Sequence, residues 1–110
     1  MKGYFGACAL LLKLQTILAN QAEDKAYRAG NLTNLTIHLT RLGEVEKALT
    51  AIDESVEILR SLIRGGREGL LPTFATSLNN MSICLANLGY LDDALSAIEE
   101  AVNIERDLIR

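Results

Sequence analysis

Hydrophobic residues recur with helical spacing along much of the chain. In two separate segments, leucine or methionine returns at steps of three and four residues. Because an α-helix turns once every 3.6 residues, this spacing gathers each set on one face of a helix. The two sets are Leu32, Leu35, Leu39 and Leu42, and then Leu78, Met81, Leu85 and Leu88.

Each of these predicted helices is followed at once by a second one. Gly43 and Gly89 come directly after the last leucine of each set, where glycine can adopt the left-handed backbone conformation that ends a helix. Acidic residues follow each glycine and arginines close each segment, which complements the helix dipole at both ends. The acidic residues are Glu44, Glu46, Asp92 and Asp93, and the arginines are Arg60, Arg64, Arg106 and Arg110. The unit is therefore a helical hairpin.

The two hairpins repeat one another with a period of 46 residues, which is the distance from Gly43 to Gly89 (89 − 43 = 46). When residues 32–64 are aligned with residues 78–110 at this shift, 17 of 33 positions are identical without a gap. The identical positions are Leu32, Asn34, Ile37, Leu39, Leu42, Gly43, Ala48, Leu49, Ala51, Ile52, Glu54, Val56, Ile58, Arg60, Leu62, Ile63 and Arg64. Such internal similarity is typical of stacked repeat proteins.

The pattern predicts an all-α fold, a solenoid of antiparallel helical hairpins with helices at roughly 2–20, 23–42, 44–64, 72–88 and 90–109. Residues 1–22 are predicted to form an apolar N-terminal helix, a partial or degenerate repeat, with a break at the "NQAED" stretch of residues 20–24. Residues 23–64 and 72–110 are the two repeats, joined by the glycine-rich linker 65–71. The glycines of this linker interrupt the helix, and Pro72 suits the first turn of the next one.

The two hairpins resemble the tetratricopeptide repeat family. The residues that carry the likeness fall at the family's large, large, aromatic, glycine, aromatic, alanine, aromatic and alanine positions. They are Leu32, Leu35, Leu39, Gly43, Val45, Ala48, Ile52 and Ser55, and then Leu78, Met81, Leu85, Gly89, Leu91, Ala94, Ile98 and Ala101. Leucine or isoleucine mostly replaces the family's aromatics, and Arg60 and Arg106 stand where proline is common. The period exceeds the usual length of about 34 residues, so the chain is similar to the long, kinesin-light-chain type.

The resemblance implies a non-catalytic scaffold that binds an extended peptide, or a segment of a partner protein, on the concave face formed by the first helices. A carboxamide offers both a donor and an acceptor, so a ladder of asparagines on that face can hold a peptide backbone. A solvated face, or asparagines that bond neighbouring helices, is the alternative. Arg41 is the one basic residue of the set, which disfavours acidic peptide ends as ligands. The candidate contact residues are Thr33, Asn34, Ile37, Arg41, Asn79, Asn80, Ile83 and Asn87.

Catalytic and metal chemistry find little support in the sequence. His38 and Cys84 are equivalent positions of the two repeats (38 + 46 = 84), and neighbouring packed helices lie about 8–10 Å apart. A thiol and its general base need about 3 Å. With one histidine and two cysteines in the chain, no spacing typical of metal ligands occurs. We therefore expect neither an enzyme nor a bound cofactor.

Composition and charge argue against nucleic acid and membranes as partners, so we expect protein partners. The net charge is −3, with 11 basic and 14 acidic residues intermixed, so no cationic stripe exists to neutralise nucleic-acid phosphates. Lys13 interrupts the apolar run near the N-terminus, which favours a buried or partner-facing helix over a membrane span, with a signal or anchor as the alternative. Cys8 and Cys84 lie in helical apolar runs and are interpreted as free thiols, which predicts a cytoplasmic location.

The two ends of the predicted stack are both apolar. Leu95, Val102 and Ile104 lie off the face of the last helix that meets its own partner helix, and apolar residues surround the first helix. Such faces belong either to a piece of a longer solenoid or to a homo-oligomer, for instance one that exchanges hairpins across residues 65–69. A self-assembly module is therefore the alternative function.

Overall fold

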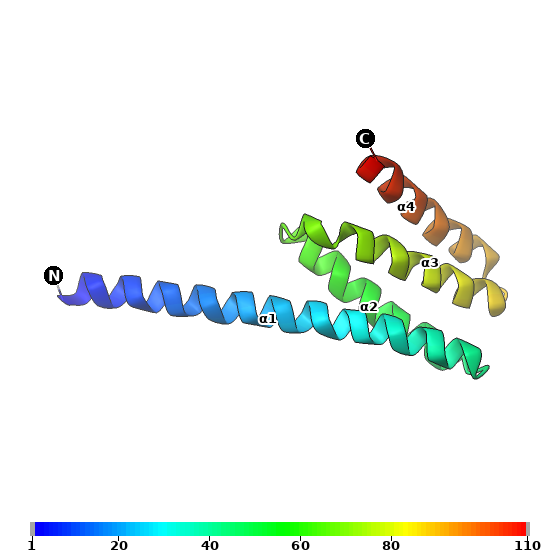
Figure 1. Ribbon diagram of the computed structural model, residues 1–110, viewed down its shortest axis with the longest axis horizontal. Helices are drawn as coiled ribbons and strands as arrows, with labels where there is room; N and C mark the ends of the chain where they lie inside the picture. The colour runs from blue at the N-terminus through cyan, green and yellow to red at the C-terminus, as the bar shows by residue number, and fades with distance from the viewer. Residues whose placement is uncertain (1, 110) are drawn as a thin grey trace.

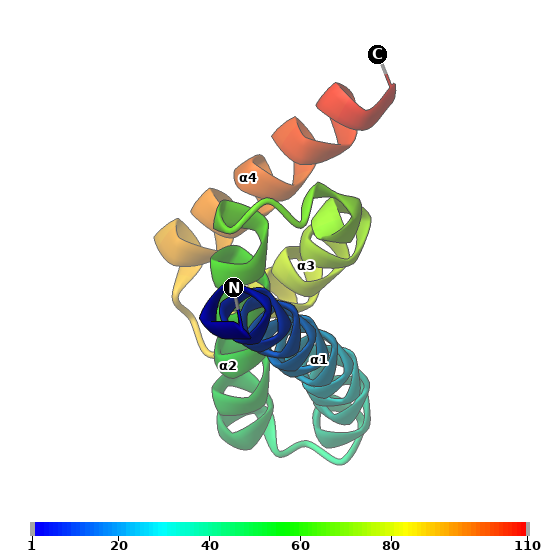
Figure 2. The same ribbon diagram turned by 90° about the vertical axis from the view of Figure 1, so that its left-hand side faces the viewer.

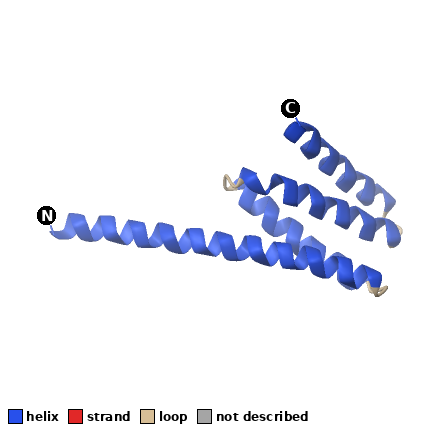
Figure 3. Ribbon diagram, in the orientation of Figure 1, coloured by secondary structure: helices blue, strands red, loops and turns tan. Residues whose placement is uncertain are grey.

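The computed structural model describes residues 2–109, and it describes the side chains of residues 10, 13, 14, 16–18 and 20–109. Four α-helices follow one another: α1 (Lys2–Arg41), α2 (Val45–Arg64), α3 (Leu71–Asn87) and α4 (Leu91–Ile109). A short 3₁₀ helix, η1 (Glu68–Leu70), precedes α3. Within residues 2–109 the regular structure is entirely helical, and short turns connect the elements (Figure 3). The all-α prediction is confirmed.

The helices form two antiparallel hairpins that stack on each other. α1 packs against α2, and α3 packs against α4. The hairpins meet where α3 packs against α2 and, more sparsely, against α1 (Figures 1 and 2). This arrangement is that of a tetratricopeptide-like solenoid, as the repeat predicted.

Both predicted corners are helix ends with a glycine in the left-handed region. Gly43 has a φ of 81° and Gly89 a φ of 88°. At the first corner, the Gly43 N–H donates to the Thr40 carbonyl (3.1 Å) and the Glu44 N–H to the Leu39 carbonyl (2.9 Å). These two bonds define a Schellman motif, and the corner at Gly89 has the same pair of bonds. The short corner turns each chain segment back along the helix that it has just left.

The predicted break at residues 20–24 is absent, so the expected helices 2–20 and 23–42 are one helix, and the prediction of five helices is wrong. α1 runs for 40 residues without interruption. The "NQAED" stretch contains no glycine or proline, and glutamine, alanine and glutamate are good helix formers. At the other boundary, Gly65 and Gly66 do end a helix, with a φ of 106° at Gly66. The N-terminal half of α1 therefore projects beyond the other helices (Figure 1).

Small residues allow the helices of each hairpin to approach closely. Their side chains are buried at matched places in the two hairpins. In the first hairpin they are Ala48, Ala51 and Ser55, and in the second Ala94, Ala97 and Ala101. Ile52, Leu59 and Leu78 fill the core between α1, α2 and α3 and are fully buried. Ile98, the counterpart of Ile52 (52 + 46 = 98), is only half-buried.

One arginine joins the two hairpins. The Arg60 guanidinium of α2 donates from Nη1 to Glu100 Oε1 of α4 (2.8 Å) and from Nη2 to Glu100 Oε2 (3.3 Å). The same guanidinium lies 5.1 Å from the centre of the Phe74 ring of α3, within the range of a cation–π contact. Arg60 occupies the position at which the resembling family often has proline. Here it connects α2 to both helices of the next hairpin.

Candidate functional site

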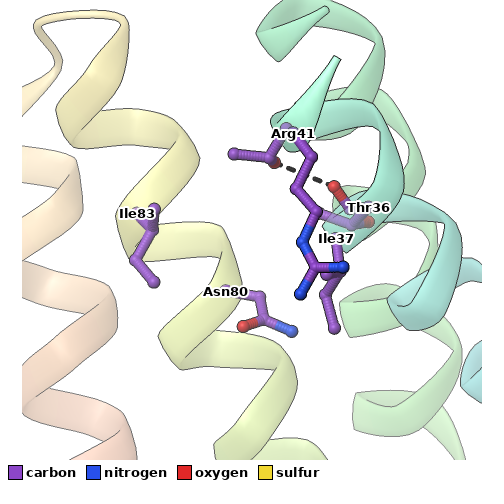
Figure 4. A pocket seen from close by; sticks show the side chains of 6 residues that line it. Thr36, Ile37, Arg41, Asn80 and Ile83 are labelled. Carbon is purple, nitrogen blue, oxygen red and sulfur yellow. Dashed lines mark hydrogen bonds between the residues drawn. The ribbon is translucent and has the colours of Figure 1, made fainter. Parts of the chain in front are cut away.

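A groove of about 280 Å³ lies between α1 and α3. α1 contributes side chains at i, i+1, i+4 and i+5, and α3 contributes two side chains one turn apart, so all six face the same space (Figure 4). The lining residues are Thr36, Ile37, Thr40, Arg41, Asn80 and Ile83. The groove is thus formed by the first helices of the two hairpins.

Half of the predicted contact residues meet in this groove. Ile37, Arg41, Asn80 and Ile83 line it, whereas the other four lie elsewhere. Asn34 and Asn87 are exposed outside it, and Asn79 is half-buried. Thr33 is in the interior.

Thr33 is held inside by a cluster of hydroxyl groups that spans three helices. Its Oγ1 lies 2.8 Å from Ser55 Oγ of α2 and 3.0 Å from Ser77 Oγ of α3. The Ser55 hydroxyl in turn donates to the Ala29 carbonyl of α1 (2.9 Å). Thr33 therefore lies in the interior and not in the groove, and its buried hydroxyl finds the partners that it needs at the junction of α1, α2 and α3.

Two threonines of the groove wall are not among the eight predicted contacts. The Thr36 hydroxyl donates to the Leu32 carbonyl and the Thr40 hydroxyl to the Thr36 carbonyl, both at 2.8 Å. These bonds remain within α1, so they use the donor of each threonine locally. The i, i+4 spacing of Thr36 and Thr40, one residue before Ile37 and Arg41, is the sequence signal that could have placed them here.

Asn80 carries an unused hydrogen-bond donor in the groove. Its Nδ2 atom is buried and has no partner, and within the described part of the chain no other buried side-chain nitrogen or oxygen lacks one. The carboxamide extends from α3 toward α1, below the Arg41 guanidinium (Figure 4). An unsatisfied buried donor costs about 1–3 kcal/mol. A ligand that offers an acceptor here would remove that cost.

The sequence was also compared with known proteins. Residues 1–62 and 64–108 match the family model described as anaphase-promoting complex subunit 5. The chain belongs to this family. A search of curated proteins and a search of solved structures found no significant match.

Membership of the subunit 5 family refines the resemblance seen in the sequence. The repeats are tetratricopeptide-like, as predicted, but the match does not support the kinesin-light-chain type. The family description names a subunit of a complex. The chain, as a member of this family, is a non-catalytic protein.

Cys84 and His38, the side chains that could suggest catalysis, lie in different surroundings. Cys84 is fully buried, and this burial raises the pKa of its thiol, so the reactive thiolate is disfavoured. Its Sγ lies 3.8 Å from the Thr40 hydroxyl, while His38 is exposed. In α4, the Glu100 carboxylate is engaged by Arg60. In the described residues, no group of three or more histidine, cysteine or acidic side chains is placed to hold a metal ion.

Within residues 2–109, no helix combines the length and the hydropathy that crossing a bilayer requires.

Proposed function

We propose that this chain is a protein-interaction scaffold whose α1–α3 groove binds an extended segment of a partner protein. The family description names a subunit of a complex, which makes other proteins the natural partners. The observation that carries the choice of groove is the buried Asn80 Nδ2 without an acceptor. A peptide backbone supplies a carbonyl at every residue, and one of them can accept from this donor.

The shape of the groove fits part of a peptide better than a whole small ligand. Small-molecule pockets measure about 300–1,000 Å³ and enclose most of the ligand, whereas this groove holds about 280 Å³. Ile37 and Ile83 are both exposed along it and provide apolar contact for one or two side chains. The Arg41 guanidinium adds planar donors for further carbonyl groups.

The wider ladder of asparagines remains part of the proposal. Asn34 precedes Ile37 by three residues, and Asn87 follows Ile83 by four, so each lies one turn away on the same side of its helix. Asn79 is the neighbour of Asn80 on α3. A peptide longer than the groove would reach these positions at its two ends.

A random linear peptide library displayed on phage and selected on the full chain tests the proposal. For the selected peptides, Asn80→Ala is expected to weaken binding about tenfold, which corresponds to one buried hydrogen bond of about 1.4 kcal/mol. Asn31→Ala is the matched control, because Asn31 is an exposed asparagine of α1 that does not line the groove. We expect it to change affinity about twofold or less.

Both variants should melt at or above the temperature of the unchanged chain, since neither loses a hydrogen bond that folding provides. Isothermal titration calorimetry gives the affinities, and circular dichroism gives the melting temperatures. Peptides that bind Asn80→Ala as tightly as the unchanged chain would remove the groove assignment.

Self-assembly through α1 is a second candidate function, favoured by one observation. On the N-terminal half of α1, Leu10, Leu14, Ile17 and Leu18 are exposed at helical spacing, so no other helix within residues 2–109 covers them. Two copies could pair these stripes as a short coiled coil. Light scattering over a dilution series is then expected to show a dimer that Leu14→Lys with Ile17→Lys converts to a monomer. A monomer at all concentrations would exclude this function.

The cytoplasmic location expected from the free thiols also stays a proposal. Cys84 is a buried free cysteine, which supports a reducing environment.

A further inference from the structure

The outer side of α4 carries an apolar stripe that no helix of the described residues covers. We define the α4 stripe as the residues that recur there at steps of three and four, namely Leu95, Ile98, Val102, Arg106 and Ile109. Ile98, Val102 and Arg106 also line a shallow hollow of about 270 Å³ in the surface of α4. The side of α4 that bears its three buried alanines is covered by α3.

The equivalent stripe on α2 is covered by the second hairpin, as comparison of the two repeats shows. Subtracting 46 from each position of the α4 stripe gives Leu49, Ile52, Val56, Arg60 and Ile63 on α2. Val56 is 4% exposed, whereas its counterpart Val102 is 38% exposed. The second hairpin stacks on α2, and no helix in residues 2–109 takes the same place on α4. The two stripes therefore have nearly the same chemistry and differ in what covers them.

The contacts of Arg60 show which side chains of the second hairpin the α2 stripe binds. Its guanidinium contacts an aromatic ring on the first helix of the incoming hairpin, Phe74, and a carboxylate on the second helix, Glu100. Arg106 is the counterpart of Arg60 (60 + 46 = 106) and is exposed. One large apolar residue of α2 outside the stripe does have a polar counterpart, since Glu105 replaces the buried Leu59. A partner must therefore also offer a donor near Glu105.

We propose that the α4 stripe docks a helical hairpin of a partner protein, which presents an aromatic ring and a carboxylate to Arg106. The contact would continue the stacking seen between the two hairpins of this chain. It is separate from the groove between α1 and α3, so either site can exist without the other.

A second copy of this chain fits the α4 stripe poorly. Its first hairpin has Arg28 at the position of Phe74 (28 + 46 = 74) and Glu54 at the position of Glu100 (54 + 46 = 100). Arg28 Nε already donates to Glu54 Oε1 (2.9 Å). Docking a second copy would set Arg106 against Arg28. The nearby carboxylate, Glu54, is already engaged by Arg28. Like charges that face each other at an interface favour a different occupant.

The test lengthens the full chain by a second copy of residues 65–110 placed after Arg110. Glu105→Leu is made in the first copy, because the same hairpin in this chain packs on the buried Leu59 at that position. Arg110 is the counterpart of Arg64, so the added segment continues the repeat with its own glycine-rich turn. Amide hydrogen exchange in α4 is expected to slow about tenfold or more, because its outer face becomes covered. The melting temperature should rise, since stability in stacked repeats includes the interfaces between neighbours.

Matched variants show whether Arg106 contacts the added hairpin. Arg106→Ala should reverse most of the protection of α4 in the lengthened chain and leave the melting temperature of the 110-residue chain unchanged. Phe74→Arg, made in the added copy alone, should do the same as Arg106→Ala. Unchanged exchange in α4, full protection with Phe74→Arg in the added copy, or a dimer of the 110-residue chain that Val102→Asp dissociates would each overturn the proposal.

Discussion

Phe74→Ala is expected to lower the free energy of unfolding by about 3–5 kcal/mol, the usual cost of removing a buried phenylalanine side chain. Phe74 is buried in the core that α1, α2 and α3 share, and its ring also lies against the Arg60 guanidinium. Its removal leaves a cavity at the junction of the two hairpins and removes one of the two contacts of Arg60. Urea unfolding followed by circular dichroism measures the loss.

Phe74→Leu is the control for this change. Leucine keeps much of the apolar volume but has no ring for Arg60, so we expect a smaller loss of about 1–1.5 kcal/mol. A loss below about 1 kcal/mol for Phe74→Ala would show that the hairpins are not joined at this position.

Ile52→Ala is expected to cost about 2–5 kcal/mol, whereas Ile98→Ala should cost about 1 kcal/mol. The two isoleucines are the same residue at the same repeat position. Ile52 is fully buried beneath the stacked hairpin, while Ile98 stays half-buried on the open side of α4. The difference therefore measures what the next hairpin contributes at this position.

Denaturant unfolding of both variants at one pH gives this comparison directly. Equal losses would mean that stacking adds no burial at Ile52, which would contradict the arrangement of α2, α3 and α4. A larger loss for Ile98→Ala would further indicate that α4 is covered in solution.

The corners and hairpins could be predicted from the sequence because their signals are local. Gly43 and Gly89 each end a helix: the glycine N–H donates to the carbonyl three positions earlier, and the N–H of the next residue donates to the carbonyl five positions before it. Glycine is favoured there for its backbone freedom. The period of 46 residues then predicted that the hairpins are alike and stack. The continuity of α1 was missed, since the "NQAED" stretch breaks the apolar pattern without containing a residue that breaks a helix.

The side on which each helix is buried depends on neighbours, which the spacing alone does not give. Leu35 and Leu42 belong to the predicted leucine stripe of α1 and are exposed, whereas Leu85 of the matching stripe of α3 is buried. α3 packs against α4, α2 and, sparsely, α1, whereas α1 packs against α2 and only sparsely against α3. Thr33 and Thr36 of α1 turn into the interior for the same reason. Four of the six residues that line the candidate groove were therefore among the predicted contacts, whereas the inward turn of Thr33 and Thr36 depends on the stacking.

The central claim is that the α1–α3 groove holds a partner segment. Nuclear magnetic resonance of the ¹⁵N-labelled full chain, titrated with a peptide selected from the library, tests it most directly. We expect the largest shifts at the backbone amides of residues 36–41 and 80–83, and their loss with Asn80→Ala. Shifts confined to α4 or to the projecting half of α1 would contradict the claim.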